Sequence, residues 1–202
     1  MKTLGFVVLL FPICWSFAQP PDTLWTRFIG TGATDYGRSV IACPDGGYLV
    51  SARYVTDSLD YSCLFMRLTE SGDIQWARTV DYFAESYPIN VWPDGEGGFA
   101  AIVFARNRDG LRGWSLIRLD GLGEFIYCRS YFFTASYQPG ILEAAASPGG
   151  GWYLVGGYRD ESYTCRLDEN GDTLWTRLYG GHEYDCGQAI AATMDGGCLT
   201  AG

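Results

Sequence analysis

The sequence contains almost no lysine and almost no histidine. Lys2 is the only lysine among 202 residues, His182 is the only histidine, and the other basic residues are arginines spread along the chain. The formal net charge is −9, so we do not expect electrostatic binding of nucleic acid or of an anionic lipid surface. After residue 18 the chain has no run of 18 apolar residues, which predicts no membrane span. Charged residues make up only 18% and aromatic residues 16%, which indicates a folded rather than a disordered protein.

The first 18 residues are typical of an export signal. Lys2 precedes an apolar stretch, and residues 16–18 (Ser-Phe-Ala) form a small-x-small cleavage site before Gln19. Cys14 follows Ile13, where a lipoprotein signal has a small residue, and this disfavours lipid attachment. We therefore predict a secreted chain, at the cell surface or outside the cell, with the periplasm as the alternative.

The mature sequence is a repeat with a period of about 50 residues. Segments such as DTLWTRFIG and GDTLWTRLY share an aromatic landmark, at Trp25, Trp76, Tyr127 and Trp175. Segments such as CPDGGYLVSA share a glycine pair, at Gly46 and Gly47, Gly97 and Gly98, and Gly196 and Gly197. We interpret the aromatic residue as a wedge against the neighbouring repeat, and the glycines as residues that let a hairpin reverse without Cβ strain.

Each period contains four runs that are typical of β-strands. In the first period they span 38–43, 48–55, 62–69 and 73–80. No segment after the leader has helical periodicity, so the sequence predicts an all-β fold built from four-stranded antiparallel β-propeller blades. The predicted units are a signal peptide at 1–18, an outer strand at 22–29, blades at 38–80, 88–131 and 140–179, and a partial blade at 187–202.

These landmarks resemble the bacterial SBBP-type β-propeller repeat. The shared pattern is W-T-R-x-x-G, then D-Y-G or D-C-G, an apolar strand, D-G-G and an L-V-x-A strand, and it covers 22–202. The third period departs from it, with Tyr127 in place of Trp and no Asp in the turn at 148–151. The repeats are also similar to those of large exported proteins of Bacteroidetes-like bacteria that use type IX secretion. The resemblance implies a propeller protein of exported, bacterial origin.

The order of the elements predicts an incomplete ring of about 3.5 blades. The segment 22–29 is an outermost strand with no inner strands before it, and the last period holds two strands. In a closed ring such a first strand completes the last blade. We therefore expect a fragment of a longer propeller, with further blades of the same chain as partners. The alternative is a short chain that forms an open arc or a homo-oligomer, whose exposed sheet edges would favour aggregation.

The six cysteines of the mature chain share no common spacing. None forms a C-x-x-C pair, and they fall at unrelated positions of the repeat, at Cys43, Cys63, Cys128, Cys165, Cys186 and Cys198. An even count in an exported protein permits disulfides. We nevertheless predict small apolar residues on strands rather than a zinc site or a disulfide framework.

Three weaker patterns have a structural interpretation that we favour over chemistry. His182 lies in a loop with Asp185 and Cys186, but the sibling loops repeat only an Asp or Ser, which predicts a loop cap rather than a metal site or a catalytic triad. Residues 168–172 alternate oxygen ligands but lack the later Gly and Glu of a calcium loop, which favours a hairpin turn. The Gly-x-x-x-Trp segment ending at Trp175 is similar to the tryptophan-docking repeats of quinoproteins. We predict no metal and no cofactor.

The predicted binding site is the propeller face that carries the loops from outermost strands to the next innermost strands. Its residues combine tyrosine rings with carboxylates, a composition that favours glycan or protein contacts, at Asp35, Tyr36, Glu85, Tyr87, Tyr137, Tyr184 and Asp185. We predict a non-catalytic binding or structural module with no catalytic residues. The alternative is a propeller enzyme, either a quinoprotein-like oxidoreductase or a glycan hydrolase, with Asp35 and Glu85 as the carboxylate pair.

Overall fold

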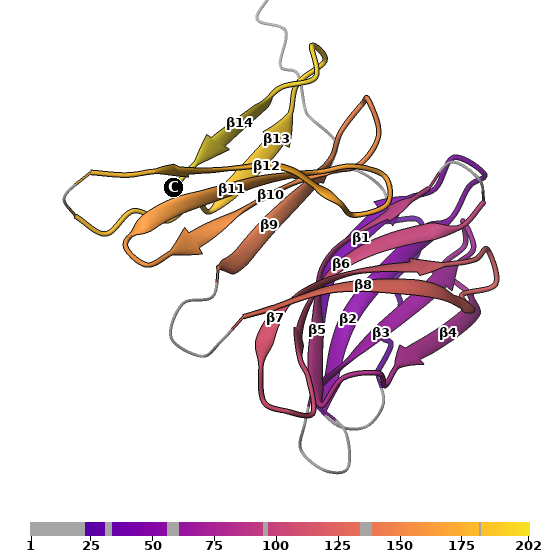
Figure 1. The fold of residues 1–202 in the computed structure, drawn as a ribbon. Coiled ribbons are helices and arrows are strands. Elements are labelled where there is room, and N and C mark those ends of the chain that lie inside the picture. Colours follow the sequence, from indigo (N-terminus) through magenta and orange to yellow (C-terminus); the bar gives the residue numbers. More distant parts are fainter. Residues whose placement is uncertain (1–22, 31–33, 56–60, 95–96, 134–138, 182) are drawn as a thin grey trace, which may run out of the picture.

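A computed structural model describes residues 23–30, 34–55, 61–94, 97–133, 139–181 and 183–202. All the regular elements in these ranges are β-strands, which form three four-stranded antiparallel sheets and one two-stranded hairpin (Figure 1). The all-β prediction is therefore confirmed. The described ranges hold no helical segment with the length and hydrophobicity that a membrane crossing requires.

The strands of each sheet pair in chain order. Sheet I contains β1 (Asp35–Ala42), β2 (Tyr48–Val55), β3 (Tyr61–Leu68) and β4 (Ile74–Val80). Sheet II contains β5 (Glu85–Pro93), β6 (Phe99–Arg106), β7 (Arg112–Leu119) and β8 (Phe125–Phe133). Sheet III contains β9 (Gly140–Ala146), β10 (Trp152–Tyr158), β11 (Glu161–Leu167) and β12 (Thr173–Tyr179). Hairpin IV contains β13 (Ala189–Ala192) and β14 (Cys198–Ala201).

The predicted blades correspond to these sheets, with differences at their starts. Sheets I and II begin three residues earlier than predicted, at Asp35 and Glu85. In both sheets the register of the first strand shifts at a β-bulge, between Gly37 and Ser39 and between Pro88 and Asn90. A bulge adds one residue and breaks the alternation of apolar and polar side chains. The predicted starts at 38 and 88 lie at or beside the bulge, so the three residues before each of them were missed.

The predicted outer strand at 22–29 is not a strand in residues 23–30, the part that the structure describes. A strand needs a neighbour that receives its backbone hydrogen bonds. None of the described strands pairs with this segment. The prediction was therefore wrong about its backbone, although its side chains dock on sheet I as an outer strand would, as described below.

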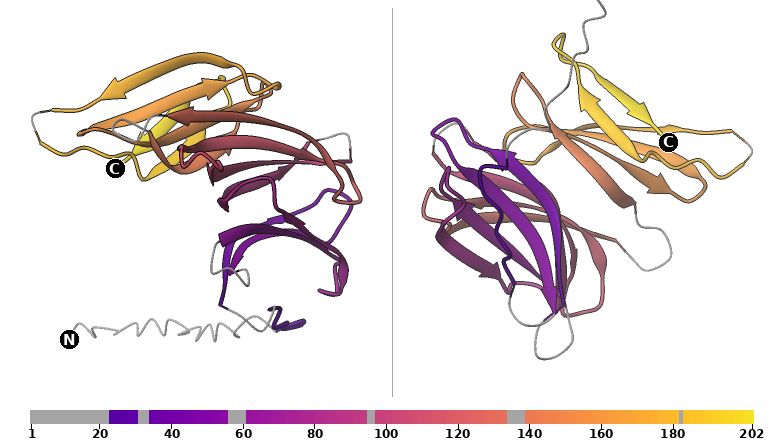
Figure 2. Two further views of the ribbon diagram at one scale, coloured as in Figure 1. Left: turned by 60° about the horizontal axis from the view of Figure 1, so that its bottom comes forward. Right: turned by 180° about the vertical axis from the view of Figure 1, so that it is seen from behind.

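The cores lie between neighbouring sheets, and sheet II is stacked between sheets I and III (Figure 2). Between sheets I and II the largest buried side chains include Leu49, Phe65 and Ile117. Between sheets II and III they include Trp114 and Leu154. Because side chains alternate between the two faces of a strand, the central sheet must be apolar on both faces. This explains the continuous buried runs in β6 and β7.

The repeated glycines and the cysteines have structural roles. Left-handed φ angles in the hairpin turns, which favour glycine, occur at Gly46, Gly47, Gly97 and Gly196. Gly98 and Gly197 lie outside that region; a Cβ at Gly98 would lie 2.6 Å from the Leu119 carbonyl oxygen, so close approach explains this glycine. All six described cysteines are free thiols; three are buried, as predicted for apolar residues on or beside strands, namely Cys43, Cys63 and Cys165.

Candidate functional site

The outer strand of sheet I docks on sheet II through a tryptophan and an arginine. Trp76 donates a hydrogen bond from Nε1 to the Gly121 carbonyl oxygen at 3.1 Å, and Arg78 pairs with Glu124 at 3.0 Å. Gly123 lies against the indole, where a Cβ would be 2.8 Å from the ring. Trp76 and Arg78 therefore link β4 of sheet I to the turn between β7 and β8 of sheet II.

Segment 23–30 makes the same contacts on sheet I. Trp25 donates from Nε1 to the Glu70 carbonyl oxygen at 2.8 Å, and Arg27 pairs with Asp73 at 2.5 Å. A Cβ at Gly72 would lie 2.8 Å from the Trp25 ring. Each of these residues precedes its counterpart in the Trp76 contact by 51 positions. Segment 23–30 therefore occupies the place on sheet I that β4 occupies on sheet II.

The other two repeat aromatics behave differently. At the third repeat Arg129 still pairs with Asp172 at 2.6 Å, but the contact with the turn comes from Tyr131, whose hydroxyl donates to the Gly171 carbonyl oxygen at 2.5 Å. The hydroxyl of Tyr127 is buried and has no hydrogen-bond partner. Trp175 packs on Tyr153 of its own sheet, with ring centroids 6.0 Å apart. Among the described residues, Tyr127 and Trp175 therefore do not repeat the hydrogen bond that Trp76 makes.

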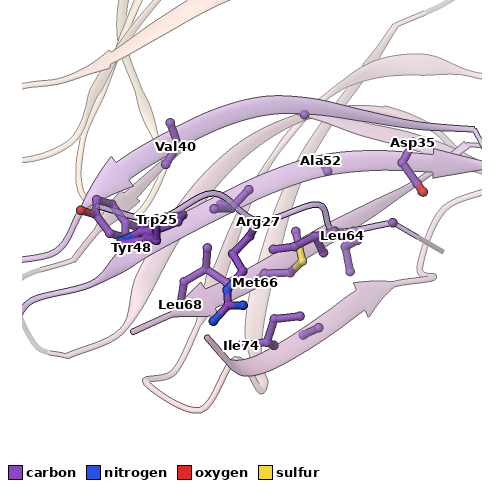
Figure 3. Close-up of a pocket in the computed structure, with 15 residues that line it drawn as sticks. Trp25, Arg27, Asp35, Val40, Tyr48, Ala52, Leu64, Met66, Leu68 and Ile74 are labelled. Carbon is purple, nitrogen blue, oxygen red and sulfur yellow. The ribbon is translucent and has the colours of Figure 1, made fainter. Parts of the chain in front are cut away.

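An apolar groove of about 680 Å³ lies between segment 23–30 and sheet I (Figure 3). Figure 3 shows Trp25 beside Tyr48 at one end and Asp35 at the other. Apolar side chains of β2 and β3 line it, namely Val50, Ala52, Leu64, Met66 and Leu68. At the rim the side chains of Val40 and Ile74 are 66% and 51% exposed. The rim of the groove is therefore open to solvent, while Ala52, Met66 and Leu68 at its floor are at most 5% exposed.

The same positions of sheet II are closed. Moving 51 residues along the chain from Val50, Ala52, Met66 and Leu68 leads to Ala101, Val103, Ile117 and Leu119. These four side chains are at most 2% exposed and form one core with sheet I. The groove is therefore the face on which, one repeat later, a preceding sheet packs.

Two of the predicted site residues, Tyr36 and Tyr87, contact an arginine that the sequence did not single out. Arg53 lies opposite Tyr36 in the register of β1 and β2. Its guanidinium carbon lies 4.2 Å from the Tyr36 ring centroid, 4.5 Å from that of Tyr61 and 5.9 Å from that of Tyr87. Glu85 is on the same strand as Tyr87, and its carboxylate pairs with Arg106 at 3.0 Å. Contacts between sheets I and II therefore create this cluster.

The electrostatic surroundings of Tyr87 show which charges the cluster holds. Burial raises the pKa of the Tyr87 hydroxyl above its ordinary value. Arg38, Arg53 and Arg112 act in the opposite direction and lower this pKa, while Glu85 raises it. Three guanidinium groups therefore lie close enough to act on one hydroxyl, in a chain whose net charge is −9.

The remaining predicted site residues lie elsewhere. Asp35 lines the groove on the other face of sheet I. The Asp185 carboxylate accepts a hydrogen bond from the Gly181 backbone N–H at 2.7 Å, which confirms its role as a loop cap. Tyr184 is 70% exposed, and contact with Cys186 raises the pKa of its hydroxyl. Tyr137 and His182 lie outside the described residues. The part of the chain that the structure describes has no group of three or more metal-ligating side chains.

A break in the repeat was the available signal for Arg53. The position 51 residues later holds Phe104, which stacks on Tyr87 with ring centroids 4.6 Å apart and planes 15° apart. Alignment of the repeats at every position shows that Arg53 in the first repeat corresponds to Phe104 in the second. The repeated aromatic and glycine positions alone do not reveal this difference. No model of a known protein family and no curated protein matches the chain.

Proposed function

We propose that this chain is part of an exported bacterial β-propeller that acts as a non-catalytic binding or structural module, and that a further blade of the same repeat covers the groove on sheet I. One observation carries the proposal: the groove is the repeat equivalent of a face that is closed in sheet II. Three four-stranded sheets stacked face to face support the propeller arrangement.

The chemistry of the partner blade follows from the interface between sheets I and II. There the preceding sheet contributes Leu49, Cys63 and Phe65, which are fully buried. We expect the partner blade to present a similar apolar set to the groove, with segment 23–30 as its outermost strand. This arrangement would remove the exposed apolar rim from water, which is the main stabilising effect of such interfaces.

The last described repeat supports the same partner. Trp175 and Arg177 correspond to Trp76 and Arg78, which bind the turn between the third and fourth strands of the following sheet. Hairpin IV has two described strands and therefore provides no such turn within the described residues. Arg177 instead lies over the Trp175 ring, 5.1 Å from its centroid. A completed blade after β14 would supply the acceptor carbonyl and the acidic partner.

The positions of Asp35 and Glu85, the two carboxylates of the alternative hydrolase interpretation, support a non-catalytic role. Glu85 is held by Arg106, and Asp35 lines an apolar groove on the opposite face of its sheet from Tyr36 and Arg53. Paired glycosidase carboxylates face one another across the scissile bond. The observed positions favour structural roles for both residues.

The coding sequence that follows Gly202 tests the assembly proposal. We expect an apolar-Arg-Leu strand like Met66-Arg67-Leu68, followed by a turn that contains a glycine and an acidic residue for Arg177. A stop codon or an unrelated sequence at this point would overturn the proposed partner blade. Export is tested separately by N-terminal sequencing of protein from the culture medium. Gln19 is the expected first residue, and a protein retained in the cell with an intact leader would contradict export.

A further inference from the structure

Two equivalent cross-strand residue pairs share a tyrosine and differ in the residue opposite it. Tyr36 lies opposite Arg53 in sheet I, and Tyr87 lies opposite Phe104 in sheet II, at positions 51 residues apart. Phe104 contacts Tyr87 by ring stacking and carries no charge. Because an apolar ring satisfies this position in sheet II, packing against the tyrosine does not require the charge of Arg53.

The Arg53 side chain also carries an unsatisfied polar atom. Its Nε is buried and has no hydrogen-bond partner, although the residue as a whole is only partly buried. A buried donor without an acceptor is unfavourable, so Arg53 is not placed here by hydrogen bonding of its Nε within the chain. The ring contacts described above come from Tyr36, Tyr61 and Tyr87. A guanidinium packed on rings keeps its N–H groups in its own plane, where a carboxylate accepts two parallel hydrogen bonds.

The surroundings favour an anion at this place. Arg38 is exposed, lies 5.9 Å from the Tyr87 ring centroid, and donates from Nε to the Pro88 carbonyl oxygen at 3.2 Å. Arg112 is exposed as well and lies close enough to act on the Tyr87 hydroxyl. Glu85 is the acidic group that raises the pKa of Tyr87, and its carboxylate is already paired with Arg106. Among the described residues that act on Tyr87, three arginines therefore face one carboxylate that is already paired.

We propose that Arg53 and the tyrosines around it bind the carboxylate of an acidic sugar, the uronate unit of an oligosaccharide. The guanidinium binds the carboxylate, and the ring of Tyr36, 45% exposed, provides an apolar surface for the C–H face of the sugar. An inorganic anion would pair with the guanidinium but would make no apolar contact with the tyrosine rings. This inference rests on the proposed binding role of the chain and does not depend on the further blade.

Binding of oligogalacturonate, measured by isothermal titration calorimetry, tests the site. The matched variant is Arg53→Phe, which reproduces the pair that sheet II already contains, and its urea midpoint is expected to equal that of the parent chain. We expect the Kd for oligogalacturonate to rise at least tenfold in Arg53→Phe, on the order of a lost charge-assisted hydrogen-bond pair. A neutral oligogalactan of the same length is expected to bind weakly to both proteins. Should Arg53→Phe unfold, Arg53→Lys keeps the charge without the planar fork and is expected to weaken binding as well.

Three results would overturn the inference. Equal affinity of the parent chain and Arg53→Phe for oligogalacturonate would show that the sugar binds elsewhere, and the absence of binding to the parent chain would remove the site. Full competition by acetate at equal concentration would mean an anion site that does not recognise the sugar, and the uronate assignment would fail. The two proposals can fail separately. If a stop codon follows Gly202 and Arg53→Phe loses sugar binding, the partner blade is rejected and the sugar site is retained. If a further blade follows Gly202 and the parent chain binds no sugar, the sugar site is rejected and the partner blade is retained.

Discussion

The two faces of sheet I carry similar side chains and have different neighbours. On one face Leu49, Cys63 and Phe65 are fully buried against sheet II. On the other face Met66 and Leu68 lie under segment 23–30, beside a groove of about 680 Å³. Alternation along a strand makes both faces apolar, because successive side chains point to opposite sides. The comparison shows that an apolar sheet face needs another segment to cover it. The residues of the face do not determine which segment that is.

The largest expected difference in unfolding free energy is between two variants, each of which shortens one side chain on one face of sheet I. Phe65→Ala leaves a cavity between two sheets and is expected to cost about 3–5 kcal/mol of unfolding free energy. Met66 is buried in a smaller cluster that borders the groove, so Met66→Ala is expected to cost less, about 2 kcal/mol. Urea unfolding of both variants measures the difference. Equal losses would mean that the groove is closed in solution.

A smaller effect is expected from the glycines under the two tryptophans. Gly123→Ala places a Cβ against Trp76 at a φ of 79° and is expected to cost about 2–3 kcal/mol, because sheet II must move against sheet I. Gly72→Ala has the same conflict with Trp25, but only segment 23–30 must move, so we expect about 1–2 kcal/mol.

Gly110→Ala is the control for backbone strain. Gly110 has a φ of 84° and open space around its Cβ position, so the variant is expected to cost about 1 kcal/mol. Chemical unfolding of the three variants gives the order. If Gly123→Ala were no more destabilising than Gly110→Ala, the indole would not be held against sheet II.

Alkaline pH sharpens the comparison through the buried thiol of the covered face. Burial raises the pKa of Cys63 from 9.0 to about 12. The folded state therefore holds this proton more tightly than the unfolded state does. The resulting stability is complete below pH 9 and is lost as the pH rises toward about 12.

Urea midpoints at pH 8 and pH 10 test this expectation, with a lower midpoint at pH 10. Cys63→Ala is the control, because it removes the titrating group from the covered face. Its midpoint is expected to fall less between the two pH values than that of the parent chain. An identical fall in both proteins would assign the alkaline loss to other groups.

The smallest effect concerns the exposed ion pairs that accompany the aromatic contacts. Arg27→Ala removes a pair whose side chains are 48% and 60% exposed, and Arg129→Ala removes a similar pair at the third repeat. Solvent screens such pairs, so each variant is expected to lose less than about 1 kcal/mol. Thermal unfolding at low and high salt measures the loss, which added salt should reduce. A loss above about 2 kcal/mol would indicate that Arg27 holds segment 23–30 by packing as well.

The amino-acid pattern predicted most strands and the turns between them. Alternating apolar residues and left-handed glycines such as Gly46 act within a few residues, so their effect is visible in the sequence. In β1 and β5 the residues before a bulge were missed, since a bulge interrupts the alternation on which the prediction depends. The segment 22–29 has the composition of a strand, but the described part of it has no neighbouring strand.

The candidate site was predicted less completely than the fold. Tyr36 and Tyr87 were expected on one face, and the structure brings both to Arg53. Arg53 itself was not identified, since the meaning of a charge at that position depends on rings that lie on other strands and on sheet II. Asp35 was expected on the same face but lines the groove instead, because its register partner Tyr54 packs against the groove side of sheet I.

The sequence by itself determined the all-β fold, the period of the repeat and the aromatic and glycine positions at which sheets meet. These features follow from side-chain alternation, turn chemistry and spacing, which are local properties of the chain. Only the tertiary structure decided which face of sheet I is closed and which charges surround Tyr87. Both depend on how one sheet docks on the next, because the groups involved lie tens of residues apart and meet only when the sheets stack.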